Sequence, residues 1–426
     1  MDFDEIIDRR GTHSSKWDTM EELYGVSPNN GLSMWVADMD FRAPDVIQQK
    51  LRSIISHGIY GYYGDQEEYK NSIKWWMENR HDWKIDTSWI FTTHGLVNGT
   101  ALCIDAFTKR GDGVILFTPV YYQFSNLIEA SERKVVECPL KLIDSHYQFD
   151  FNAYERKLSG DEKMIILSSP HNPGGRVWTR KELQEVAKFA IKHDLILVSD
   201  EIHHDLVYPN KNHTVMPIAE PAVCDRLVMM TATTKTFNIA GAHTGNVIIS
   251  NIRLQQKFSK RITALGISAN SFGLFMATTA YSSEGAKWLD ELIKYIDGNR
   301  NLFDRAIDAI PGLKSMPLEG TYLAWVDFSG TGMEEKEFIH RVQEKANIAV
   351  NSSDARPSRF VGGERIDTAI SELNIEKRKV SLSIKLLEEL QNKEAVTKFS
   401  SPLSGKNLPF SSLSEKLEDK GNKDDE

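Results

Sequence analysis

Cysteine is scarce in this sequence. The 426 residues contain three cysteines, Cys103, Cys138 and Cys224, which lie far apart. An odd number at such spacing fits neither a disulfide framework nor a set of zinc ligands, so we expect a reducing compartment. No apolar run approaches the roughly 20 residues of a membrane-spanning helix, and the acidic N-terminus lacks the pattern of a signal sequence. The sequence therefore predicts a cytoplasmic protein with no membrane partner.

A strong charge bias is also missing. Lys and Arg number 51 against 60 Asp and Glu, a net charge of −9 that is spread along the chain. Since no basic stripe stands out, we expect no nucleic-acid partner. Apolar residues make up 41% and charged residues 26%, as in ordinary globular proteins, which excludes a wholly disordered, collagen-like or coiled-coil chain. At about 150 residues per domain, the length predicts two or three domains.

Four short apolar runs mark the middle of the chain. They lie at 114–117, 164–167, 195–198 and 227–230. Because these runs are continuous rather than alternating, they predict strands covered on both faces, as in a parallel sheet. Between the second and third runs, 179–182 is a capping box at the start of a helix with an apolar stripe. Such strand–helix–strand units predict an α/β fold with a mostly parallel, doubly wound sheet.

The C-terminal third of the chain has a different pattern. The alternating part of the segment 319–328 predicts a half-buried strand in a smaller α+β domain. Near the C-terminus the sequence becomes polar and rich in Ser, Lys and Glu, which is typical of disorder. We therefore expect four parts: an N-terminal segment at 1–45 that packs on the small domain, a large domain at 46–285, a small domain at 286–391 and a disordered tail at 392–426.

Side chains suited to one cofactor follow the four apolar runs. Tyr121, Asn172, Asp200 and Lys235 come in this order after consecutive runs, and ligands of α/β sheets bind beyond the carboxyl ends of the strands. Pyridoxal phosphate needs a lysine for the Schiff base, a carboxylate for the pyridine nitrogen, a polar partner for the ring hydroxyl and an aromatic ring to stack on. The glycine turn at 93–99 precedes an apolar segment and would offer backbone N–H groups to the phosphate.

Seven segments extend this pattern over much of the chain. They are 9–18, 34–41, 57–62, 119–122, 170–175, 200–203 and 235–241. Together they resemble the fold-type I pyridoxal-phosphate enzymes of the aminotransferase class I/II group. More narrowly, they resemble its MalY- and PatB-like cystathionine β-lyase (C–S lyase) branch. The resemblance implies pyridoxal 5′-phosphate as cofactor and a small-molecule amino-acid substrate.

The resemblance also implies a role for each matching residue. Lys235 would form the Schiff base and move the substrate's Cα proton, and Thr234 would help to bind the phosphate. Asp200 would pair with the pyridinium nitrogen and Asn172 with the ring hydroxyl. The phosphate would receive backbone N–H groups from Gly95, Leu96 and Val97.

Four further residues would complete the site by the same resemblance. Tyr121 would stack on one face of the ring and Ile202 on the other, with His203 near the ring hydroxyl. Tyr62 would reach the phosphate of the neighbouring subunit's cofactor, which implies a homodimer. Adjacent histidines such as His203 and His204 indicate a metal only where other ligands converge. Since the sequence shows no such ligands, we expect no metal.

Simpler interpretations of several of these residues stay open. Asp200 could be a helix N-cap, Asn172 a turn former before proline, and Tyr121 an ordinary core residue. Tyr62 could serve packing alone.

One family residue is missing from its usual place. Family members carry an arginine near the C-terminus whose bidentate fork binds the substrate carboxylate. Depending on the register, that position falls at Glu372 or Thr368. Three arginines lie nearby, at Arg356, Arg359 and Arg365. The departure begins at about residue 352, and a reading-frame change and genuine divergence both explain it.

The function implied by the resemblance is a pyridoxal-phosphate-dependent C–S β-lyase. Such an enzyme releases thiol, pyruvate and ammonia from cystathionine or related S-substituted cysteines. Two alternatives remain open. One is a class I/II aminotransferase, which shares the lysine, the aspartate and the asparagine. The other is a regulatory or interaction protein on the same fold, an alternative that the missing arginine favours.

Overall fold

The computed structural model describes residues 1–351, 369–374 and 379–383. The chain divides into two units, Met1–Arg359 and Phe360–Glu426. In the second unit, β14 (Ala369–Asn374) pairs antiparallel with β15 (Lys379–Ser383). The predicted tail at 392–426 lies outside the described residues, and the predicted domain boundaries at 45, 285 and 391 stay predictions.

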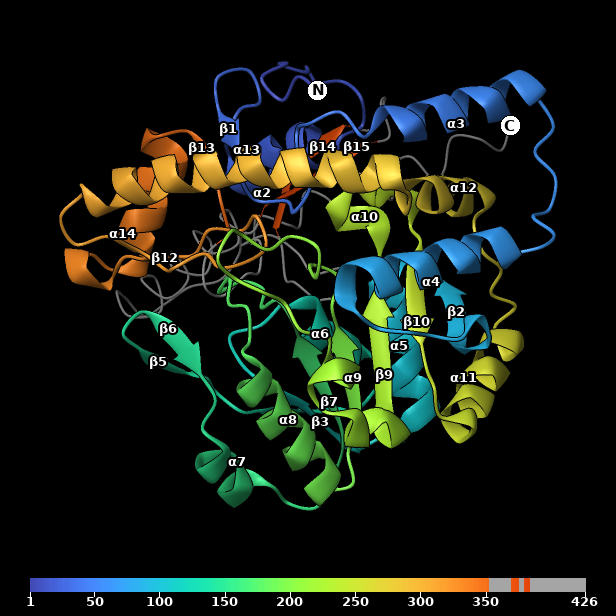
Figure 1. The fold of residues 1–426 in the computed structure, drawn as a ribbon. Helices are drawn as coiled ribbons and strands as arrows, with labels where there is room; N and C mark the ends of the chain where they lie inside the picture. Colours follow the sequence, from blue (N-terminus) through green and yellow to red (C-terminus); the bar gives the residue numbers. More distant parts are fainter. Residues whose placement is uncertain (352–368, 375–378, 384–426) are drawn as a thin grey trace, which may run out of the picture. The chain divides into compact units, whose positions relative to one another are not determined.

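A seven-stranded sheet forms the centre of the first unit (Figure 1). Its strands, in spatial order, are β2 (Ile90–Thr93), β10 (Gly245–Ile248), β9 (Leu227–Thr231), β8 (Ile196–Asp200), β7 (Glu162–Ser168), β3 (Gly113–Leu116) and β4 (Lys134–Glu137). Strand β10 is antiparallel to both of its neighbours, whereas the pairs from β9 to β4 are parallel. The four predicted apolar runs are the strands β3, β7, β8 and β9.

Helices cover both faces of this sheet. Alternate strand residues enter two separate cores, as Ile115 and Val114 do in β3. One core is closed by α5 (Gly95–Phe107), α6 (Gln123–Ala130) and α11 (Ile252–Ala264). The other is closed by α7 (Phe151–Lys157), α8 (Arg180–Lys192) and α9 (Met216–Ala219). The predicted doubly wound α/β arrangement is therefore confirmed.

The predicted capping box is present at the start of α8. The Thr179 side chain accepts the N–H of Glu182, and the Glu182 carboxylate accepts the N–H of Thr179. These bonds satisfy backbone donors that the first helical turn leaves free, so the helix begins at a defined residue.

A third core joins the N-terminal helices to the end of the large sheet. It contains residues of α4 (Glu67–His81), α12 (Ser271–Ala280) and the long α13 (Ser283–Asp308), with α3 (Asp45–His57) beside α12. Figure 1 shows α13 running across the top of the unit. Short strand β1 (Leu32–Ser33) pairs parallel with β13 (Ile348–Ala349), which ties the N-terminal segment to the region after α13.

The strand predicted within 319–328 is short. Only β12 (Val326–Asp327) is a strand, paired with β11 (Lys314–Ser315). Thr321 has a φ of 67°, a left-handed conformation that interrupts an extended chain. Its N–H donates to the carbonyl of Leu206 over 2.7 Å, so this segment is tied to the loop after β8 instead of to a sheet.

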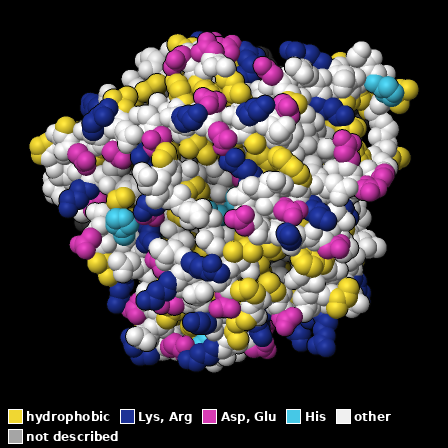
Figure 2. All heavy atoms as spheres, in the orientation of Figure 1, with side chains coloured by type: hydrophobic (Ala, Val, Ile, Leu, Met, Phe, Trp, Pro, Cys, Tyr) yellow, Lys and Arg dark blue, Asp and Glu magenta, His cyan; other side chains and the backbone are white. Residues whose placement is uncertain are grey.

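The surface carries both signs of charge. Figure 2 shows Lys and Arg side chains interspersed with Asp and Glu over the visible face. None of the helices in the described part of the chain combines the length and the apolar character that crossing a membrane requires.

Candidate functional site

The carboxyl ends of the parallel strands bring the predicted residues to one edge of the sheet. Asp200 ends β8, and its register partners are Ser168 at the end of β7 and Met230 in β9. The short helix α10 (Thr233–Thr236), which contains Lys235, follows β9 directly. Asp200 and Lys235 thus extend from neighbouring strands over the same edge.

Lys235 is held by a backbone acceptor. Its Nζ donates to the carbonyl of Ala37 over 2.6 Å, and the Tyr322 hydroxyl donates to the same oxygen over 2.9 Å. Burial lowers the pKa of Lys235, while the carboxylates of Asp38 and Asp200 partly oppose that shift. The amine is therefore easier to deprotonate than a surface lysine, as a nucleophile and base must be.

Asp200 is a buried carboxylate. Its Oδ1 accepts the N–H of Ile202 over 3.1 Å. Burial raises the pKa of Asp200 to about 7; the charge of Glu201 adds to this shift, and the Ile202 hydrogen bond and Lys235 oppose it. The residues that follow form turns and not a helix, which removes the helix-cap interpretation. A buried acid of this kind is stabilised by a cationic partner such as a pyridinium.

The glycine turn enters a helix as predicted. Gly95 has a φ of 80° and begins α5, whose first N–H groups have no partner within the helix. The Leu96 side chain is buried in the core, while that of Val97 is exposed. Both residues lie in the first turn of α5, where the positive end of the helix dipole attracts anions. Thr234 is buried in α10.

The remaining predicted residues lie around the same strand ends. Burial, Tyr122 and Asp200 all raise the pKa of Tyr121, which packs edge-on against Phe124 with ring centroids 5.6 Å apart. Asn172 lies in the loop after β7, where its N–H donates to Ser168 Oγ over 3.1 Å.

His203 lies in the loop after β8. Burial, with a contribution from Lys235, lowers the pKa of His203 to about 3. Its ring lies 6.0 Å from that of Tyr322, and its buried Nδ1 has no hydrogen-bond partner within the described residues. Ile202, next to it, is partly buried against the core. Tyr62 differs from all of these because its side chain is fully exposed.

The sequence analysis named the segment 34–41 but did not predict its contact with Lys235. Arg9 makes a bidentate pair with Asp38, with both N–O distances 2.9 Å, and bonds Asp40 over 2.8 Å. Asn238 Nδ2 donates to the carbonyl of Met39 over 2.8 Å. These contacts fix the chain directly after Ala37. The bases Arg9 and Lys16 in one segment and the acids Asp38 and Asp40 in the other are the signal that could have suggested this clamp.

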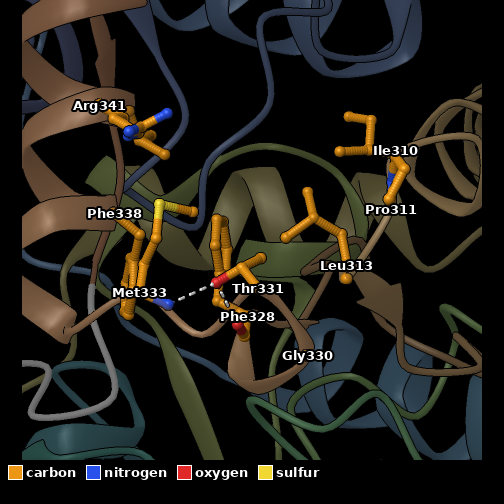
Figure 3. A pocket seen from close by; sticks show the side chains of 11 residues that line it. Ile310, Pro311, Leu313, Phe328, Gly330, Thr331, Met333, Phe338 and Arg341 are labelled. Atoms are coloured by element: carbon orange, nitrogen blue, oxygen red, sulfur yellow. Dashed lines mark hydrogen bonds between the residues drawn. The ribbon is translucent and has the colours of Figure 1, made fainter.

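One cavity lies away from this cluster. It has a volume of about 640 Å³ and is lined by residues from the end of α13 to the segment after α14 (Glu335–His340). Figure 3 shows Phe328, Met333 and Phe338 on one side and Leu313 on the other. None of the predicted site residues lines it. Asp200 and Lys235, whose pKa values are shifted, lie in the strand-end cluster, which is therefore the better candidate for the site.

Comparison with known proteins places this chain in a family. Residues 36–360 match the family Aminotransferase class I and II. Cystathionine beta-lyase PatB of Bacillus subtilis is 38% identical over 351 residues, which cover 82% of this chain and 90% of that protein. Protein MalY of Escherichia coli is 29% identical, with 82% and 89% covered.

Solved structures agree. The structure of cystalysin from Treponema denticola, which contains a pyridoxal 5′-phosphate cofactor, has a TM-score of 0.78 at 39% identity and covers 82% of this chain and 89% of that chain. The PLP-bound C–S lyase from Staphylococcus hominis has a TM-score of 0.77 at 26% identity, with 93% and 97% covered. The predicted fold class and family are confirmed: the chain belongs to the aminotransferase class I and II family.

Proposed function

We propose that this chain is a pyridoxal-phosphate-dependent C–S β-lyase. It would release thiol, pyruvate and ammonia from cystathionine or related S-substituted cysteines. The observation that carries the proposal is the placement of Lys235 beside the buried carboxylate of Asp200 at neighbouring strand ends, in a chain 38% identical to the cystathionine beta-lyase PatB.

The residues present fit the cofactor. Asp200 is a buried acid suited to a cationic ring nitrogen, His203 has a buried ring nitrogen without a partner within the described residues, and α5 opens its first N–H groups to an anion. We infer that Lys235, Asp200, Asn172 and the start of α5 hold pyridoxal phosphate. When bound, the cofactor supplies an electron sink for charge that develops at the substrate's Cα.

Lys235 would then take up the proton from the substrate's Cα. The lowered pKa of Lys235 leaves a larger fraction of its amine neutral, ready to take the Cα proton. Ala37 and Tyr322 define where that amine rests. As the Cα proton moves to Lys235, the C–S bond at Cβ breaks and the sulfur leaves with its electron pair. The remaining three-carbon fragment reacts with water to give pyruvate and ammonia.

We also propose that the enzyme is a cytoplasmic homodimer. Ile55, Ile59, Tyr60 and Tyr62 are all strongly exposed and lie close together in the chain, at the end of α3 and in the loop after it. A group of exposed apolar side chains is typical of a protein interface. In a dimer formed through this surface, the Tyr62 side chain would reach into the site of the partner subunit. The three cysteines have free thiols, in keeping with a reducing compartment.

Product analysis tests the proposed reaction. Purified protein is incubated with cystathionine, with and without an added 2-oxo acid, beside the variants Lys235→Ala and Lys163→Ala. A lyase forms thiol and pyruvate without the oxo acid. We expect Lys235→Ala to lose this activity and the absorbance band of the cofactor bound to Lys235. Lys163→Ala, at an exposed lysine, is the control and should keep both. Conversion of the oxo acid to its amino acid would identify an aminotransferase. Cofactor binding without turnover of any sulfur amino acid would instead favour the regulatory alternative.

A further inference from the structure

Two histidines and an aspartate meet in a buried cluster that the proposed reaction does not use. His81 ends α4, while His204 and Asp205 lie in the loop after β8. Asp205 Oδ1 is 2.9 Å from His81 Nε2, and Asp205 Oδ2 is 3.5 Å from His204 Nε2. The side chains of His204 and Asp205 have no exposed surface, and that of His81 is 6% exposed. Each residue offers a ligand atom within 4.8 Å of the other two.

These separations suit a small metal ion. A tetrahedral zinc ion with bonds of about 2.0–2.1 Å places neighbouring ligand atoms about 3.3 Å apart. The separation of 2.9 Å between His81 Nε2 and Asp205 Oδ1, which is also a hydrogen bond, and that of 3.5 Å between His204 Nε2 and Asp205 Oδ2 are close to this value. Small rotations of the three side chains would therefore bring them into coordination.

His204 presents a lone pair to this space. Its Nδ1 lies 2.6 Å from the carbonyl of Glu201, so Nδ1 carries the proton and donates it to that oxygen. With its proton on Nδ1, the neutral ring has its lone pair on Nε2. That buried Nε2 has no hydrogen-bond partner within the described residues. It faces a carboxylate oxygen with no proton between them, an arrangement that a cation would stabilise.

The Asp205 carboxylate is also held in place. Trp76 Nε1 donates to its Oδ1 over 2.9 Å, and the Thr236 hydroxyl donates to its Oδ2 over 2.8 Å. Metal-binding histidines commonly donate their other N–H to a backbone carbonyl, and metal-binding carboxylates are themselves hydrogen-bonded. Both kinds of support are present around this cluster.

We propose that His81, His204 and Asp205 form a binding site for a divalent transition-metal cation of the zinc class. Two imidazoles and one carboxylate are ligands of the type that zinc accepts, with a fourth position left for water. The sequence shows no such site because His81 and Asp205 are 124 residues apart. Thr236, which bonds Asp205, adjoins Lys235 in α10, so a bound ion would also brace the helix that carries the lysine.

Metal titration of the holoenzyme tests the proposal. The protein is freed of metal with a chelator and then titrated with Zn²⁺ by calorimetry and with Co²⁺ by visible absorption. The expected result is one ion per chain and a cobalt spectrum typical of tetrahedral nitrogen and oxygen ligands. His204→Gln should weaken binding by more than about tenfold, and His57→Gln, at an exposed histidine, should not change it.

Three results would overturn the proposal. They are no ion bound by the wild type, equal binding by wild type and His204→Gln, and a cobalt band of thiolate ligation, which would place the ion on a cysteine. If His204→Gln fails to fold, as judged by circular dichroism, His81→Gln replaces it. The wild-type cobalt spectrum decides the question even if neither variant folds, since it reports the ligand type directly.

Discussion

The amine of Lys235 donates a hydrogen bond over 2.6 Å to the backbone carbonyl of Ala37, which lies 198 residues earlier in the chain. The hydroxyl of Tyr322 donates to the same oxygen over 2.9 Å. One carbonyl therefore joins the N-terminal segment, helix α10 and the segment before β12. If Lys235 binds the cofactor as proposed, Tyr322 would still donate to this carbonyl.

Replacing Tyr322 with phenylalanine should weaken this junction. The buried hydroxyl is lost while the ring remains, so we expect the free energy of unfolding to fall by about 0.5–1.5 kcal/mol. Turnover should fall less than in Lys235→Ala, because the proton-transfer group is intact. Urea unfolding and pyruvate release measure the two effects. Tyr295→Phe is the matched control, since that hydroxyl bonds Asp4 at an exposed position; an equal loss in both variants would contradict the prediction.

In the protein freed of cofactor, the burial of Asp200 should make the free energy of unfolding depend on pH. The pKa of this carboxyl is about 7 in the folded protein against an ordinary value of 3.8. The folded state therefore holds a proton that the unfolded state has lost, and the wild type loses stability as the pH rises through this window. At a pH below 3.8 this loss of stability vanishes, and at a pH above about 7 it reaches its full size.

Asp200→Asn removes that titration, so the variant should gain stability relative to the wild type as the pH rises from about 4 to about 8. Thermal unfolding of both cofactor-free proteins across this range measures the difference. A constant gap between the two curves would show that Asp200 is not the titrating group.

The sequence predicts this site only in part, and for physical reasons. Continuous apolar runs mark buried parallel strands, and the ends of such strands converge, so Asp200 and Lys235 could be placed together in advance. A backbone carbonyl such as that of Ala37 carries no sequence signal. The alternation at 319–328 suggested a strand, but the left-handed conformation of Thr321 and its bond to the loop after β8 depend on tertiary structure.

The clamp around Ala37 should depend on Arg9. Its bidentate pair with Asp38 is partly buried, with side-chain exposures of 22% and 19%. Arg9→Gln should therefore cost about 1.5–3 kcal/mol of unfolding free energy, as charged hydrogen bonds do, and should lower turnover by loosening the chain over Lys235. Arg42→Gln breaks a pair with Glu5 that is 54% and 42% exposed, and should cost less than about 1 kcal/mol. Denaturant unfolding and kcat compare the two; similar losses would argue against a clamp.

Subunit exchange tests the proposed role of Tyr62. If each site needs Lys235 of one subunit and Tyr62 of its partner, then Lys235→Ala and Tyr62→Ala are each inactive or nearly so. Mixing and refolding them in equal amounts would restore about one quarter of wild-type activity, because half of the dimers are hybrids with one intact site of two. Two copies of the same variant, mixed in the same way, are the control. No recovery in the mixture would place Tyr62 outside the partner's site or exclude a dimer.

Replacing the chain after Asn351 should restore what the missing arginine supplied. The family match ends at residue 360, and the positions compared above with the carboxylate-binding arginine, Glu372 and Thr368, carry no such group. A charge-assisted pair of that kind is worth about 2–5 kcal/mol. A hybrid that carries the C-terminal segment of PatB should therefore bind cystathionine at least about tenfold more tightly than the native chain. The same hybrid with its family arginine changed to glutamine should lose the gain, which KM for cystathionine measures. Equal KM values for the native chain and the hybrid would mean that another residue of this chain already binds the carboxylate.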